Sequence, residues 1–161
     1  MVKFETDVRI ARAPEDVFRY VTAVERIPEW QSQAGVKRVD RSSPELLRPG
    51  SEFTMRRETG RGTATIECEV TAVDAPKRFD FHSIDSDGFV GDFATTLTRN
   101  GDGTTGLHWA VDMRPPNLLY RVLSPMIRRE IRKSALVDFE NLKRILESGP
   151  PTRPGTNADV V

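Results

Sequence analysis

The sequence predicts an α+β domain in which a curved antiparallel sheet of seven strands wraps around one long C-terminal helix. Three observations lead to this fold class. Residues 2–11 alternate between apolar and polar side chains, residues 35–113 hold strand-like runs separated by turns, and residues 125–147 carry apolar side chains mostly three or four positions apart. A period of two is typical of a half-buried strand, and the longer period is typical of an amphipathic helix.

The N-terminal segment predicts one strand and two short helices. The alternation along 2–11 places apolar side chains on one side only, which indicates a strand with one buried face. Pro14, with two acidic residues directly after it, is a helix start signal, because Pro fits the first helical position and acids favour the first turn. Pro28 then interrupts the pattern, so we expect Trp30 on a second short helix.

The central segment predicts a meander. Its turn sequences, rich in Gly, Pro, Asn and Asp, are 48–50, 59–62, 75–77, 85–88 and 100–103. Strands joined by such short turns must pair antiparallel, because a parallel pair needs a long crossover. We expect about six strands here, with the N-terminal strand as the seventh.

The C-terminal segment predicts the long helix and a tail. Ser124 can cap this helix and Pro125 suits its first position, after a short helical turn over 117–123. We assign residues 1–148 to one domain. Residues 149–161 have no periodicity and are rich in Pro and Gly, so we expect a disordered tail.

Composition excludes some classes of function. The 161 residues suit one domain, and 24 basic residues balance 24 acidic ones, which gives no electrostatic reason to expect nucleic acid or an anionic membrane as a partner. The basic cluster at 128–133 is expected to be a solvated helix face, with a phosphate or membrane contact as the alternative. The single cysteine cannot form an intramolecular disulfide. We find no signal-peptide pattern and no apolar run of the ~20 residues that a membrane span needs. We therefore expect a cytoplasmic protein without stable membrane insertion, while the oligomeric state stays open.

The strand period assigns an apolar, aromatic inner face and a polar outer face. A helix crossing a curved sheet leaves space that suits a small-molecule pocket, although a fully packed core is the alternative. The residues expected to line the pocket are Trp30, Phe53, Met55, Arg57, Ile66, Cys68, Phe81, Ser83, Phe93, Thr95, Trp109, Val111, Met113, Ile127 and Ile131.

Some of these residues have a second interpretation. Arg57 is the one charged residue among them, and it either reaches solvent along its stem or faces a carboxylate or phenolate at the pocket mouth. Ser83 and Thr95 either hydrogen-bond a ligand or satisfy the backbone. Trp30 could gate the cavity, and Cys68 is expected to be inert packing.

The sequence predicts no catalytic residue, no metal site and no cofactor. His82 and His108 fall on the outer parity, and no spacing of ligands suits zinc. The glycines near residues 60–62 and 101–103 lie between strands and do not precede a helix, so they form no phosphate cradle.

Four segments carry a family resemblance. Residues 10–18, 27–30, 49–53 and 138–147 resemble, in order and spacing, the START-like, polyketide cyclase/dehydrase and lipid-transport superfamily (the SRPBCC group) over about residues 3–147. The resemblance implies the helix-grip fold and a cavity for a hydrophobic ligand under the long helix. It transfers no catalytic residue.

Three functions remain as hypotheses. The first is binding or carrying of a small hydrophobic molecule such as a lipid, a polyketide or a quinone-like compound. The second is an enzyme similar to the polyketide aromatases and cyclases, acting mainly by positioning its substrate. The third is an interaction module like the co-chaperones of the superfamily.

Overall fold

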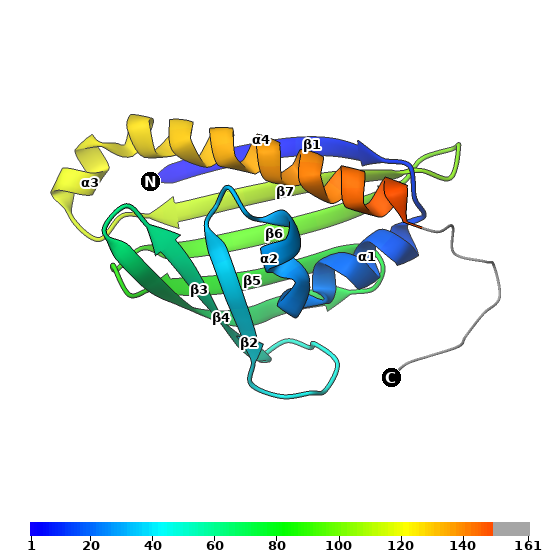
Figure 1. Ribbon diagram of the computed structural model, residues 1–161, viewed down its shortest axis with the longest axis horizontal. Helices are drawn as coiled ribbons and strands as arrows, with labels where there is room; N and C mark the ends of the chain where they lie inside the picture. The colour runs from blue at the N-terminus through cyan, green and yellow to red at the C-terminus, as the bar shows by residue number, and fades with distance from the viewer. Residues whose placement is uncertain (150–161) are drawn as a thin grey trace.

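The computed structural model describes residues 1–149, and the segment expected to be a tail lies, apart from Gly149, outside the described residues. Figure 1 shows a curved sheet that holds the long helix α4 against one face. The strands are β1 (Val2–Ile10), β2 (Val36–Arg41), β3 (Glu52–Thr59), β4 (Gly62–Asp74), β5 (Arg78–Asp85), β6 (Val90–Arg99) and β7 (Thr105–Arg114). The helices are α1 (Pro14–Thr22), a 3₁₀ turn (Val24–Arg26), α2 (Ile27–Trp30), α3 (Leu118–Val122) and α4 (Ser124–Ser148).

The seven strands form one antiparallel sheet in the order β1-β7-β6-β5-β4-β3-β2. The meander follows chain order because each short turn reverses the chain. The N-terminal strand adds to the last one, with Val2 opposite Met113 and Ile10 opposite Thr105. The predicted fold class is confirmed.

The start of α4 differs from the sequence prediction. Ser124 is the first helical residue, and Leu123 occupies the capping position without a side-chain cap. The Ser124 hydroxyl instead donates to the backbone carbonyl of Tyr120 in α3, at 3.3 Å. The hydroxyl therefore joins α3 to α4, and Pro125 still lies in the first turn, where it needs no intrahelical partner.

The core lies between the concave face of the sheet and α4. Inward residues such as Phe53, Cys68 and Leu107 are buried, as the strand period requires. One register shift, between Val70 and Ala72, lets the strands bend while the inward parity of β5 and β6 is kept. An exception on the outer face is Asp80, which is buried beside Arg78.

None of the helices in residues 1–149 is both long enough and apolar enough to cross a bilayer.

Candidate ligand-binding site

The two halves of α4 are packed differently. Every buried residue of this helix belongs to its C-terminal part, and Phe139 and Leu142 are the largest of them. Ile127 and Ile131 lie on the same side of the helix by its period, yet they are only half-buried. The N-terminal half of α4 is therefore covered less than the C-terminal half, on which Trp30 of α2 also packs.

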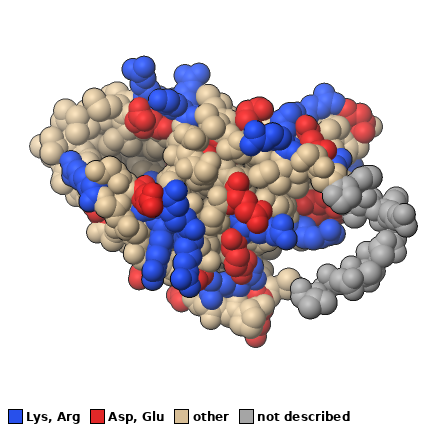
Figure 2. Space-filling view, in the orientation of Figure 1, with Lys and Arg blue, Asp and Glu red and all other residues tan. Residues whose placement is uncertain are grey.

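The inner face of the sheet is also incompletely covered. Phe81, Phe93, Trp109 and Met113 have the inward parity of β5, β6 and β7, but they too are only half-buried. Figure 2 shows a hollow at this end of the molecule, bordered by α3 and the N-terminal half of α4. Apolar side chains on both sides of a hollow are the usual wall of a small-molecule site.

An aromatic row crosses the inner face of the sheet. Phe81 stacks on Phe93, with ring centroids 4.8 Å apart and planes 10° apart. Phe93 lies 6.0 Å from Trp109, and Trp109 lies 5.3 Å from Phe139 on α4. Phe53 packs edge-on against Phe81 at 5.3 Å. The structure thus brings these residues, which the strand period had grouped, into direct contact.

Gly91 makes room for the Phe93 ring of this row. A Cβ atom at its position would lie 2.8 Å from the Phe93 ring and 3.1 Å from the Ser83 hydroxyl. Because any side chain would displace the Phe93 ring, glycine at position 91 allows Phe93 to lean over the strand. The Phe93 ring therefore lies over Gly91, between its two cross-strand partners Ser83 and Met113.

One ion pair lies on the inner face. The Arg57 guanidinium is 3.3 Å from the Asp85 carboxylate, and the side chains are 33% and 7% exposed, respectively. Asp85 also accepts a hydrogen bond from the backbone N–H of Asp87 at 2.8 Å. Arg57 therefore has a carboxylate partner within the protein. Sequence reasoning missed Asp85, although it lies two residues after Ser83 on the same parity.

The other predicted polar residues are buried. Ser83 and Thr95 lie within the inner face, and Trp30 is 5% exposed, packed 5.4 Å from the Phe139 ring. Trp30 is thus part of the core and does not form an exposed gate. Its Nε1 atom and the Arg57 Nε atom are buried donors without a hydrogen-bond partner among the described residues. The remaining predicted residues Met55, Ile66, Cys68 and Val111 are buried core residues.

The nucleophilic and imidazole groups lie away from the hollow or are shielded. Burial raises the pKa of the Cys68 thiol to about 12, so it stays protonated and unreactive at neutral pH. His82 pairs with Asp92 at 2.7 Å, and His108 pairs with Asp7 at 2.8 Å, both on the outer face. Within residues 1–149, no cluster of three or more metal-ligating side chains is present.

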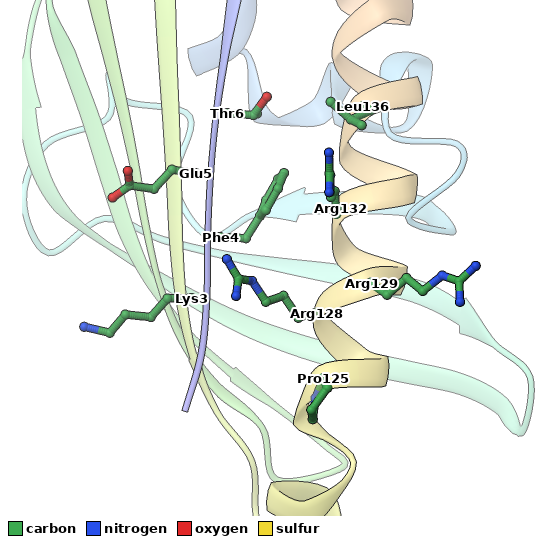
Figure 3. A pocket seen from close by; sticks show the side chains of 9 residues that line it. All are labelled: Lys3, Phe4, Glu5, Thr6, Pro125, Arg128, Arg129, Arg132 and Leu136. Atoms are coloured by element: carbon green, nitrogen blue, oxygen red, sulfur yellow. The ribbon is translucent and has the colours of Figure 1, made fainter.

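A groove of about 720 Å³ opens between β1 and the N-terminal half of α4. Figure 3 shows the side chains of Phe4 and Arg128 in the space between strand and helix, while Lys3 and Glu5 point to the other side of β1. Phe4 also packs edge-on against Trp109 at 6.2 Å, so it separates the groove from the aromatic row. The alternation of β1 placed Phe4 inward, but only the position of α4 shows that a groove runs beside it.

Solved structures with the same fold share little sequence with this chain. A START superfamily protein from Mycobacterium smegmatis has a TM-score of 0.69 at 13% identity, over 90% of this chain and 97% of that one. The major latex-like protein 151 of Panax ginseng has a TM-score of 0.68 at 17% identity, over 89% and 95%. Protein MLL2253 of Mesorhizobium loti has a TM-score of 0.70 at 19% identity, over 92% and 98%. At these identities the likeness shows the helix-grip fold alone.

No curated protein matches this chain. The family described as polyketide cyclase/dehydrase and lipid transport matches residues 1–147, which is nearly all of the domain that the structure describes. The chain therefore belongs to the polyketide cyclase/dehydrase and lipid transport family.

Proposed function

We propose that this protein binds and carries a small hydrophobic molecule in the hollow between the sheet and the N-terminal half of α4. The observation that carries the proposal is the half-burial of inward apolar side chains from both walls, Phe93 and Trp109 on the sheet and Ile127 and Ile131 on the helix. A core that packed solidly would bury them fully.

The energy of binding comes from covering these side chains. Each 100 Å² of apolar surface removed from water contributes about 2.5 kcal/mol, before the cost of immobilising the ligand is subtracted. A flat ring system suits the wall, because stacked and tilted aromatic rings such as Phe81 and Phe93 present flat faces. A lipid, a polyketide or a quinone-like molecule satisfies the apolar requirement.

The buried polar atoms favour a ligand with a neutral hydrogen-bond acceptor. Arg57 Nε on the inner face is a donor without a partner among the described residues, and leaving a buried donor unpaired costs about 1–3 kcal/mol. A carbonyl or phenol oxygen on the ligand would accept from such a donor. A carboxylate is less suited, because Asp85 already neutralises the Arg57 guanidinium. Polyketides and quinones carry the required carbonyls.

A matched pair of probes tests both parts of the proposal. 2-Methyl-1,4-naphthoquinone and 2-methylnaphthalene share the same rings and differ in the two carbonyls. We expect both to bind, the quinone more tightly, with amide chemical-shift changes in β5, β6, β7 and the first half of α4 in NMR titrations. Arg57→Met removes this donor and keeps an apolar stem, so it should weaken the quinone alone.

A variant that fills the hollow is compared with a surface variant as its control. Ile127→Trp places a large ring in the hollow and should weaken both probes about tenfold or more, which corresponds to the loss of about 1.4 kcal/mol. Leu46→Trp adds the same ring at an exposed loop position and should leave binding unchanged. Equal affinity of both variants, or no shift in the wild-type protein with either probe, would remove the support for a carrier.

A second candidate function is an enzyme resembling the polyketide cyclases. It is favoured by one observation, the Arg57–Asp85 pair on the inner face. The guanidinium could orient a ligand carbonyl while the carboxylate accepts a proton from the neighbouring carbon. Turnover of a 1,3,5-triketone probe by the wild-type protein, and its loss in Asp85→Asn with probe binding retained, would support this function. Binding without turnover in the wild-type protein would favour the carrier.

A further inference from the structure

We propose that α3 and the first turns of α4 dock on the surface of an anionic lipid bilayer. We call this surface the α3–α4 tip and define its apolar part by Leu118, Leu119, Val122 and Met126. The proposal goes beyond ligand binding and does not depend on it.

The first argument is the distribution of exposed apolar side chains. Leu118 is 73% exposed, Leu119 65%, Val122 70% and Met126 64%. Of nine large hydrophobic residues exposed on the described part of the chain, six lie on α3 and α4. Single exposed apolar residues are ordinary, but a cluster at one end of a molecule indicates an interaction surface.

The second argument is the charge around this cluster. The segment 117–137 carries five basic side chains and one acidic one, although the whole chain is neutral. The basic residues are Arg121, Arg128, Arg129, Arg132 and Lys133. None of them forms an ion pair within residues 1–149, whereas arginines elsewhere, such as Arg41 and Arg78, are paired with carboxylates.

The helix period puts both features on one surface. Met126, Arg129 and Lys133 are three and four residues apart, so they follow one another along the outer side of α4. All three are exposed, while Ile127 and Ile131 face the sheet. A helix face that combines apolar side chains with Arg and Lys fits the boundary between lipid headgroups and acyl chains, where long cationic side chains reach the phosphates.

The surroundings favour a bilayer over an acidic protein. The tip borders the hollow in Figure 2, and the groove beside it holds Arg128 in Figure 3, so apolar and cationic groups continue inward from the tip. Three of the four apolar tip residues are Leu or Val, which are under-represented among the residues that carry the binding energy of protein interfaces. A bilayer offers an anionic layer above an apolar one in the order that the tip requires.

Vesicle co-sedimentation of the full chain tests the proposal. Vesicles of phosphatidylcholine alone are compared with vesicles containing one-third phosphatidylglycerol. We expect at least about tenfold stronger binding to the anionic vesicles in low salt, because several cations act together at the surface. The difference should largely disappear near 1 M salt, where the screening length falls to about 3 Å.

Two double variants separate the apolar and the electrostatic parts. Leu118→Glu/Val122→Glu and Arg129→Glu/Lys133→Glu should each lower binding to anionic vesicles about tenfold or more. Arg56→Glu/Lys77→Glu has the same charge change at exposed positions on β3 and in the turn after β4, and it should bind more strongly than the tip variants. Circular dichroism checks that each variant is folded.

A fluorescent label reports insertion directly. Because Cys68 is buried, Val122→Cys can be labelled selectively with an environment-sensitive dye, and Leu46→Cys serves as the exposed control. We expect the label at 122 alone to brighten on anionic vesicles. The proposal is overturned if the wild-type protein binds anionic and neutral vesicles equally, if the tip variants bind like the wild type, or if both labels respond alike.

Discussion

The Asp138 carboxylate on α4 accepts a hydrogen bond from the backbone N–H of Ala34, at 3.0 Å, in the loop between α2 and β2. Its other oxygen accepts from the neighbouring N–H of Gln33 at 2.9 Å. Asp138 is buried, and no salt bridge neutralises it among the described residues. The C-terminal half of α4 is thereby fixed to the loop, whereas no side-chain hydrogen bond or ion pair within residues 1–149 ties its N-terminal half to the sheet.

Replacing Asp138 should destabilise the protein. Asp138→Ala leaves two N–H groups without their acceptor, and we expect a loss of about 2 kcal/mol in the free energy of unfolding, within the usual range for unpaired buried donors. Glu140→Ala, at an exposed position on the same helix, is the control and should change stability by less than about 0.5 kcal/mol. Urea unfolding monitored by circular dichroism measures both, and equal small effects would contradict the role of Asp138.

The ionisation of Asp138 should be visible in the pH dependence. Burial raises its pKa above the ordinary value, although the two backbone hydrogen bonds oppose this shift. A carboxyl with a raised pKa in the folded state binds more protons there than in the unfolded chain, so its contribution to stability falls as pH rises through that window. We expect Asp138→Asn to be most destabilising below the unfolded pKa and less so above the folded one. A difference between the two proteins that grows with pH would contradict this sign.

The Cys68 thiol should not react in the folded protein. Its pKa of about 12 leaves almost no thiolate at pH 8, and the side chain is buried between β-strand neighbours. We expect labelling by a disulfide reagent to be at least about a hundredfold slower without denaturant than in denaturant, because reaction then requires unfolding. Fast labelling of the native protein would show that the hollow reaches Cys68.

The Arg57–Asp85 pair should contribute measurably to stability. Arg57→Met leaves the buried Asp85 carboxylate without its counter-ion, and we expect a loss of about 2 kcal/mol, below the range of about 3–5 kcal/mol for fully buried pairs because Arg57 is partly exposed. Arg56→Met, one residue earlier and exposed, is the matched control. In the double variant Arg57→Met/Asp85→Asn, the combined loss should be smaller than the sum of the single losses. Strict additivity would show that the pair does not interact.

Replacing Phe53 should destabilise the protein more than replacing Phe93, because Phe53 is more deeply buried. Phe53 is fully buried, so Phe53→Ala should lower the free energy of unfolding by about 4 kcal/mol. Phe93 is half-buried beside the hollow, so Phe93→Ala should cost about 2 kcal/mol. Chemical unfolding measures both values. A larger loss for Phe93 would indicate that its environment is packed solidly.

The fold could be predicted because its signals are local. The alternation along β1 and β3 and the apolar period of α4 depend only on neighbouring residues, and short turns leave antiparallel pairing as the one option. The inward position of Phe81, Phe93 and Trp109 followed from the same period. Asp85 could also have been found on this basis.

The position of the candidate site could not be predicted in this way, because it depends on how segments far apart in the chain pack together. The sequence alone determined which side chains face α4, because a strand repeats every two residues. Only the tertiary structure decided that Phe139 is buried while Ile131 is half-buried, that Asp138 reaches Ala34, and that a groove lined by Phe4 and Arg128 runs between β1 and α4. These facts follow from how a rigid helix lies against a curved sheet and against the loop after α2, and no local sequence period specifies that arrangement.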